Sequence, residues 1–120
     1  MSIEDLDKID RVYRDPDTDR VVLVITDHLP WDDDEGRHLE LLQAKVYRQL
    51  DVIESGEVAE KVPFARGKSY AIAIYSLHEL SQDGRNLVNN LTPYLAGMGV
   101  ELRWILFDPK ATPPKPVMLN

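Results

Sequence analysis

Residues 20–35 read Arg-Val-Val-Leu-Val-Ile-Thr-Asp-His-Leu-Pro-Trp-Asp-Asp-Asp-Glu, and this stretch decides the fold. Its first half is a continuous apolar run rich in β-branched residues, which is typical of a strand that is buried on both faces. Its second half is a polar turn with four consecutive acids, after which apolar residues recur at helical spacing. We therefore expect a central strand that passes through an acidic turn into an amphipathic helix.

The segments around this stretch extend it to the order ββαβαβ. We expect a hairpin over residues 9–26, a helix from about Asp33 to Ser55, a strand over Lys68–Leu77 and a last strand over Val100–Phe107. Strand–helix–strand units favour parallel pairing. We therefore predict a two-layer α/β (α+β) domain in which a mixed four-stranded sheet carries two helices on one face. A three-layer sandwich with one helix on each side is the alternative.

Four local details complete this prediction. Asp32, with Glu35 three positions later, resembles a capping box and predicts the start of the first helix. Residues 57–67 lack a period and are expected to form a connector. Ser81 or Asp83 is expected to cap the second helix, and Pro93 should bend this helix or divide it in two. The small Ala71 and Ala73 of the third strand would let a helix pack closely on their face.

The composition indicates one globular domain over residues 1–110 and a proline-rich tail over residues 111–120. The chain has no cysteine, which excludes disulfides, thiol nucleophiles and cysteine metal sites and fits a cytoplasmic location. No apolar stretch approaches the ~20 residues of a membrane span. We expect the tail to cover an edge of the sheet, on its own domain or on a second copy, and to favour a homodimer.

Charge is distributed unevenly along the chain. Residues 1–60 carry a net charge of −10 and residues 61–120 a net charge of +3, which together give the −7 of the whole chain. Nucleic-acid binding needs clustered Lys and Arg, so it is not expected. The acidic N-terminal half favours solubility and could also attract a basic protein partner.

The candidate site is the turn Asp27–Glu35. As a binding surface it offers Asp27, His28, Trp31, Asp32, Asp33 and Asp34, with Trp31 either packed on the first helical turn or exposed as an anchor. We expect no metal and no cofactor, because the spacing of the acids matches no calcium loop and the chain has no glycine-rich phosphate loop. The first functional hypothesis is a non-catalytic interaction domain, for example an immunity- or regulator-type protein. The alternative is a small hydrolase-like or metal-assisted enzyme that uses Asp27, His28 and His78.

Two motifs carry a resemblance over residues 7–107, clearest over residues 20–56. Asp27-His28-Leu29-Pro30-Trp31 and the helix end Ile53-Glu54-Ser55-Gly56 resemble a family of small stand-alone bacterial proteins of unknown function, which is marked by Asp-His-Leu-x-Trp and Ile-Glu-Ser-Gly. The resemblance implies a bacterial cytoplasmic protein. It implies no activity and no catalytic residue.

Overall fold

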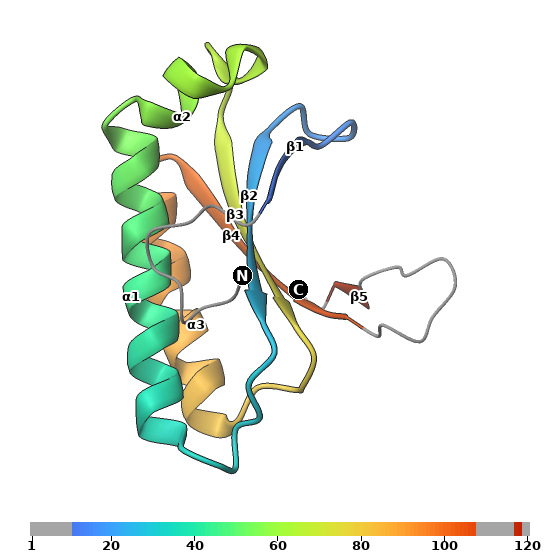
Figure 1. Ribbon diagram of the computed structural model, residues 1–120, viewed down its shortest axis with the longest axis vertical. Coiled ribbons are helices and arrows are strands. Elements are labelled where there is room, and N and C mark those ends of the chain that lie inside the picture. Colours follow the sequence, from blue (N-terminus) through green and yellow to red (C-terminus); the bar gives the residue numbers. More distant parts are fainter. Residues whose placement is uncertain (1–10, 108–116, 119–120) are drawn as a thin grey trace.

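The computed structural model describes residues 11–107 and 117–118, which form a five-stranded sheet in the order β1-β2-β3-β4-β5 (Figure 1). The central strands β2, β3 and β4 are parallel, and β1 and β5 are antiparallel to their neighbours. The bounds are β1 (Arg11–Arg14), β2 (Val21–Asp27), β3 (Tyr70–Ser76), β4 (Val100–Leu106) and β5 (Val117–Met118). The mixed sheet confirms the predicted α+β class, and β5 is an addition to the four predicted strands.

The two long helices, α1 (Glu35–Glu54) and α3 (Gln82–Ala96), lie side by side on one face of the sheet (Figure 1). Each helix connects two adjacent parallel strands, so the crossovers alone place the helices against the sheet. The arrangement is the two-layer one that the sequence predicts, and not the three-layer alternative. None of the helices among the described residues has the length and apolarity needed to cross a membrane.

The main core fills the space between the helices and the sheet. Alternate residues of β2, Val21, Leu23 and Ile25, point into it, and Leu42 and Leu95 reach it from the two helices. All five side chains are fully buried. Burying one such aliphatic side chain stabilises a fold by about 1.5–3 kcal/mol, so this layer is the main source of the stability of the domain.

The opposite face of the sheet holds a second, smaller cluster. Val22, Ala71, Ala73 and Ile105 form it, with half-buried tyrosines packed against it. The expectation that Ala71 and Ala73 face a helix is therefore wrong. The alternation of the strand directs Ile72 and Ile74 to the helices, and the alanines consequently face away from them.

The N-cap of helix α1 lies two residues after the predicted cap. Its N-cap is Asp34, whose side chain accepts a hydrogen bond from the backbone N–H of Arg37 at 3.2 Å. Asp32 lies in the preceding turn and is exposed, so the prediction of an Asp32 cap is wrong. All three aspartates are suitable caps by residue type, and the turn geometry selects the last of them.

The connector at residues 57–67 is more ordered than its sequence suggests. It forms a one-turn helix, α2 (Glu57–Lys61), and a 3₁₀ turn, η1 (Pro63–Ala65). Gly56 separates α1 from α2 with a backbone φ of +82°, a conformation that favours glycine. Val58 and Ala65 are buried in the main core, and this burial holds the two short elements in place.

Helix α3 continues through Pro93 without a second start. Its N-cap is Ser81, whose hydroxyl accepts a hydrogen bond from the N–H of Gly84 at 3.0 Å. Pro93 lies in the last turn, where only the bond to the carbonyl of Asn89 is lost. The helix ends at Ala96, and Gly99, with φ +79°, leads into β4.

The tail contributes β5 to the sheet of its own domain. Val117 and Met118 pair with Leu106 and Ile105 of β4. The predicted boundary at residue 110 and most of the tail lie outside the described residues, as do residues 9 and 10 of the predicted hairpin.

Candidate functional site

The acidic turn is anchored by a buried Asp–His pair. Asp27 ends β2 and faces the helix layer, where the Nε2 atom of His38 lies 2.8 and 2.6 Å from its two carboxylate oxygens. The backbone N–H of Leu29 donates a further bond to the same carboxylate at 3.2 Å. With Asp27 ionised, His38 is the donor through Nε2–H. Both side chains are 1% exposed, so the pair is part of the core.

Burial changes the pKa of Asp27. Removal from water raises the pKa of Asp27, and the hydrogen bond from His38 opposes this effect without cancelling it. The carboxylate is therefore a costly buried charge that is stabilised by a directed donor.

Trp31 covers the outer side of the Asp27–His38 pair. Its indole stacks on the imidazole of His38 with the ring centroids 3.6 Å apart and the planes 15° from parallel. Its outer edge also lies against α3, where a Cβ on Gly84 would meet the Cη2 atom of Trp31 at 3.0 Å. Trp31 therefore packs between both helices, as the packing interpretation of the sequence predicts. His38 is the fourth residue of α1, so the contact resembles a hydrophobic staple.

Acid–base chemistry would have to use the other imidazole nitrogen. Nδ1 of His38 is buried and has no hydrogen-bond partner among the described residues. It could accept a proton, but a general base must come within hydrogen-bond distance of its substrate. In this conformation Trp31 covers the ring, so an external substrate does not reach it.

The structure places the three residues of the predicted cluster, Asp27, His28 and His78, in two different environments. His28 and His78 are both exposed, after β2 and β3, whereas Asp27 is buried and bonded to His38. Over residues 11–107 and 117–118, no group of three or more His, Asp or Glu side chains could hold a metal ion.

Sequence reasoning missed His38 as the partner of Asp27. The signal was a histidine on or near the apolar stripe of the helix that follows a strand ending in an aspartate. A buried imidazole needs a polar partner, and the carboxylate at the strand end is the nearest one that the topology provides.

Asp32, Asp33 and Asp34 are all exposed on the turn before α1. Asp34 is engaged as the helix cap. Neither Asp32 nor Asp33 forms an ion pair or hydrogen bond with any residue that the structure describes. These two carboxylates therefore present unneutralised charge to the solvent.

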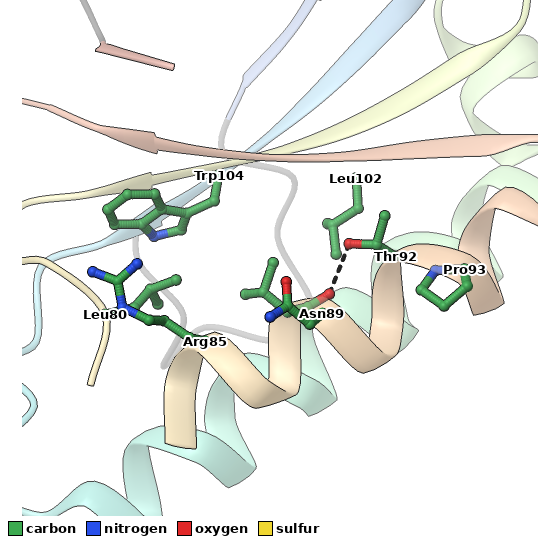
Figure 2. A pocket seen from close by; sticks show the side chains of 8 residues that line it. Leu80, Arg85, Asn89, Thr92, Pro93, Leu102 and Trp104 are labelled. Atoms are coloured by element: carbon green, nitrogen blue, oxygen red, sulfur yellow. Dashed lines mark hydrogen bonds between the residues drawn. The ribbon is translucent and has the colours of Figure 1, made fainter. Parts of the chain in front are cut away.

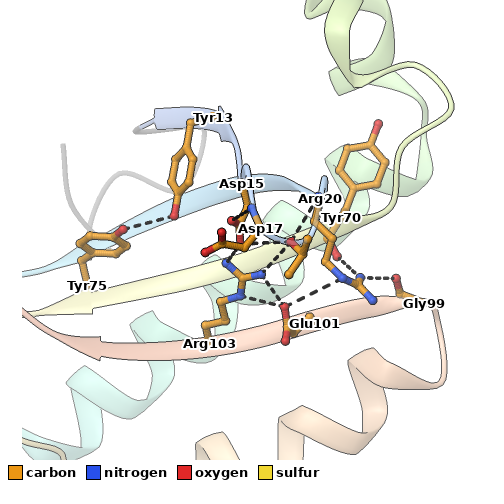
Figure 3. A network of polar contacts seen from close by, with 10 residues as sticks. Tyr13, Asp15, Asp17, Arg20, Tyr70, Tyr75, Gly99, Glu101 and Arg103 are labelled. Atoms are coloured by element: carbon orange, nitrogen blue, oxygen red, sulfur yellow. Dashed lines mark hydrogen bonds and ion pairs between the residues drawn. The ribbon is translucent and has the colours of Figure 1, made fainter. Parts of the chain in front are cut away.

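A second aspartate-rich turn, between β1 and β2, behaves differently (Figure 3). Asp15 pairs with Arg103 at 2.9 Å, and Asp19 pairs with Arg14 and Lys68, each at 2.6 Å. The backbone N–H of Asp17 is the main cause that lowers the pKa of Asp15, with Thr18 and Arg103 contributing. Asp15 and Asp19 are thus neutralised within the domain, whereas the exposed carboxylate of Asp17 has no ion-pair partner among the described residues.

Arg103 belongs to β4 but reaches the turn after β1 across the face of the sheet opposite the helices (Figure 3). Its guanidinium also binds Glu101 of its own strand at 2.7 Å, and only 6% of its side chain is exposed. On the same face the hydroxyls of Tyr13 and Tyr75 are 3.3 Å apart. Polar contacts thus join β1 to β3 and the turn after β1 to β4.

Comparison with known proteins yields one finding. The model of DUF6572, a family of unknown function, matches residues 1–108. The chain belongs to the DUF6572 family. This confirms the predicted membership of a family of unknown function. Searches of curated proteins and of solved structures found no match. The site of this DUF6572 protein is therefore defined by its own geometry: a buried Asp27–His38 pair, a covering Trp31 and exposed carboxylates at Asp32 and Asp33.

Proposed function

We propose that this DUF6572 protein is a non-catalytic interaction domain that binds a basic protein partner on the turn Asp27–Glu35. The observation that carries this proposal is the contrast between its two acidic turns. Asp15 and Asp19 are neutralised by cations of their own domain. Asp32 and Asp33 are exposed and have no ion-pair partner among the described residues.

The rigidity of the turn supports a binding role. Asp27, His38 and Trp31 fix the segment just before the acids, and the Asp34 cap fixes the segment just after them. A surface held in its bound shape loses little conformational entropy on association. In this proposal the buried Asp27 and Trp31 hold the surface in shape, and the partner contacts His28, Asp32, Asp33 and Asp34.

The charge of the turn suggests how the partner is recognised. Exposed carboxylates accelerate association with a positively charged surface and disfavour acidic competitors. An immunity- or regulator-type protein of a bacterial cytoplasm is one concrete form of this function, and the domain would work as a homodimer.

The enzymatic alternative has less support. Its central carboxylate, Asp27, is buried, and the partner of that carboxylate is the equally buried His38. Catalysis would require the covering Trp31 to leave the site.

The proposal is tested by affinity purification from an extract of the source cells, followed by quantitative mass spectrometry. The informative variant is Asp32→Asn/Asp33→Asn, which removes two charges and leaves the Asp34 cap intact. The matched control is Asp51→Asn/Glu54→Gln, which removes two exposed charges from the far end of α1.

We expect the wild type and the control to enrich the same basic protein, and the Asp32→Asn/Asp33→Asn variant to lose it. The enrichment should also fall between 50 and 500 mM salt, because salt screens exposed charges. A partner that both double variants retain equally, or no enriched partner at all, would contradict the proposal.

A further inference from the structure

A cleft of about 340 Å³ lies between α3 and β4, and none of the residues that line it belongs to the acidic turn (Figure 2). Clefts of this size are typical of small-molecule sites. Side chains from β4 project toward α3, and side chains from α3 project toward β4, so that both elements line it (Figure 2). The proposed interaction function uses no residue of this cleft.

One part of the cleft is apolar. Leu80, Val88, Leu102 and Trp104 line it. The indole N–H of Trp104 already donates a hydrogen bond to the hydroxyl of Ser76 at 2.8 Å. The polar group of the indole is thereby satisfied inside the fold, and the ring offers its carbon surface to the cleft.

The other part of the cleft is polar and cationic. Arg85 is the one charged side chain among the described residues that line it, and its guanidinium extends from α3 toward Trp104 (Figure 2). Neither the guanidinium of Arg85 nor the side-chain amide of Asn89 forms a hydrogen bond or ion pair with any residue in the described ranges. The acids nearest in sequence, Glu79 and Asp83, are exposed and do not line the cleft.

These groups define a ligand by its chemistry. A guanidinium with free N–H donors binds a carboxylate through two parallel hydrogen bonds, and the Asn89 amide can add a third. The adjacent apolar surface takes an aliphatic or aromatic body. We propose that the cleft binds a small organic monocarboxylate, with its carboxylate on Arg85 and its apolar body against Leu102 and Trp104.

The proposal is tested by titrating the ¹⁵N-labelled full chain and following its backbone and indole N–H signals by NMR. The probes are hexanoate, the uncharged hexanamide of nearly the same shape, and acetate, which lacks the apolar body. The two indole signals are assigned with the Trp31→Phe variant, which retains the Trp104 signal.

We expect hexanoate to shift the Trp104 indole signal and the α3 amides saturably. It should bind about tenfold more tightly than hexanamide, because hydrogen bonds from the guanidinium to a charged carboxylate are stronger than those to a neutral amide. Acetate should bind more weakly than hexanoate. Arg85→Gln should abolish the preference for hexanoate over hexanamide. Arg66→Gln, which removes an exposed arginine outside the cleft, should preserve it.

Three results would overturn the proposal. Hexanoate could shift neither Trp104 nor α3, it could bind no better than hexanamide, or its affinity could survive Arg85→Gln. Because Arg85 is exposed, its replacement does not disturb the core, and the wild-type signals of the β2 and β3 amides serve as the check on folding.

Discussion

Nε2 of His38 lies within 2.8 Å of both carboxylate oxygens of Asp27, and this bond ties the end of β2 to the first turns of α1. The strand end and the helix start are thereby fixed relative to each other, with the exposed acids between them. The pair is a support for the turn surface, and its energetics can be measured separately from any binding.

The buried carboxylate should make stability depend on pH. Because burial raises the pKa of Asp27 above its ordinary value of 3.8, the folded state holds this proton more tightly than the unfolded state. The contribution of Asp27 to the free energy of unfolding is therefore largest below pH 3.8 and is lost as pH rises through the folded pKa. Asp27→Asn lacks this titration, so urea melts from pH 4 to 8 should show the wild type losing stability relative to the variant. A constant difference across this range would contradict the prediction.

The position of the α1 cap can be checked by two alanine variants. Asp34→Ala should lower the free energy of unfolding by about 1 kcal/mol, because it removes the acceptor for the N–H of Arg37. Asp32→Ala should change it by less than about 0.5 kcal/mol, because the residue is exposed and caps nothing. Urea melts of both proteins decide the matter, and an equal or larger loss for Asp32→Ala would place the cap at Asp32.

Contact between Trp31 and α3 predicts opposite effects for two glycines. Gly84→Ala should destabilise the domain, since its Cβ would lie 3.0 Å from Cη2 and 3.1 Å from Cζ2 of Trp31. Gly36→Ala, with no atom within 4 Å of its Cβ, should stabilise the domain by up to about 1 kcal/mol through helix propensity. Trp31→Phe removes both contacting atoms. In that background Gly84→Ala should lose most of its penalty, because only the contact with Cδ2 of Leu80 at 3.2 Å remains. A penalty of unchanged size in thermal or urea melts would argue against the contact with Trp31.

The tail should stabilise the domain by pairing with the outer edge of β4. Deleting residues 111–120 removes β5 and exposes the outer side of Ile105 and Leu106, so the melting temperature should fall. Light scattering on both proteins shows whether the same segment also holds a homodimer together. Melting curves that match those of the full chain would mean that β5 contributes nothing to stability.

Much of the architecture could be predicted because the spacing of the apolar residues and the order of strands and helices indicate the same fold. The apolar run of β2 and the helical spacing of Leu42, Val46 and Leu50 predict a strand and a helix whose apolar surfaces cover each other. The crossover connections then predict parallel pairing. The two-residue β5 and the one-turn α2 lie below the length at which a period can be recognised.

The site was harder to predict because it depends on side-chain geometry. Three consecutive aspartates have equal capping chemistry, and only the path of the turn distinguishes Asp34 from Asp32. Asp27 and His38 are eleven residues apart, and no spacing rule brings a strand end to that helix position. Pro93 was overvalued as a breaker, because in the last turn it removes a single hydrogen bond.

The ion pair between Arg103 and Asp15 links the edge strand β1 to the central strand β4. The four-residue β1 is short enough to fray, yet the turn that follows it is held through Asp15 to a buried guanidinium on β4, with β2 and β3 lying between. Opening β1 therefore requires either breaking this ion pair or moving β4 as well. Amide protons of β1 should then exchange with solvent at rates close to those of the central strands, and Arg103→Met should make β1 exchange faster while leaving β3 slow.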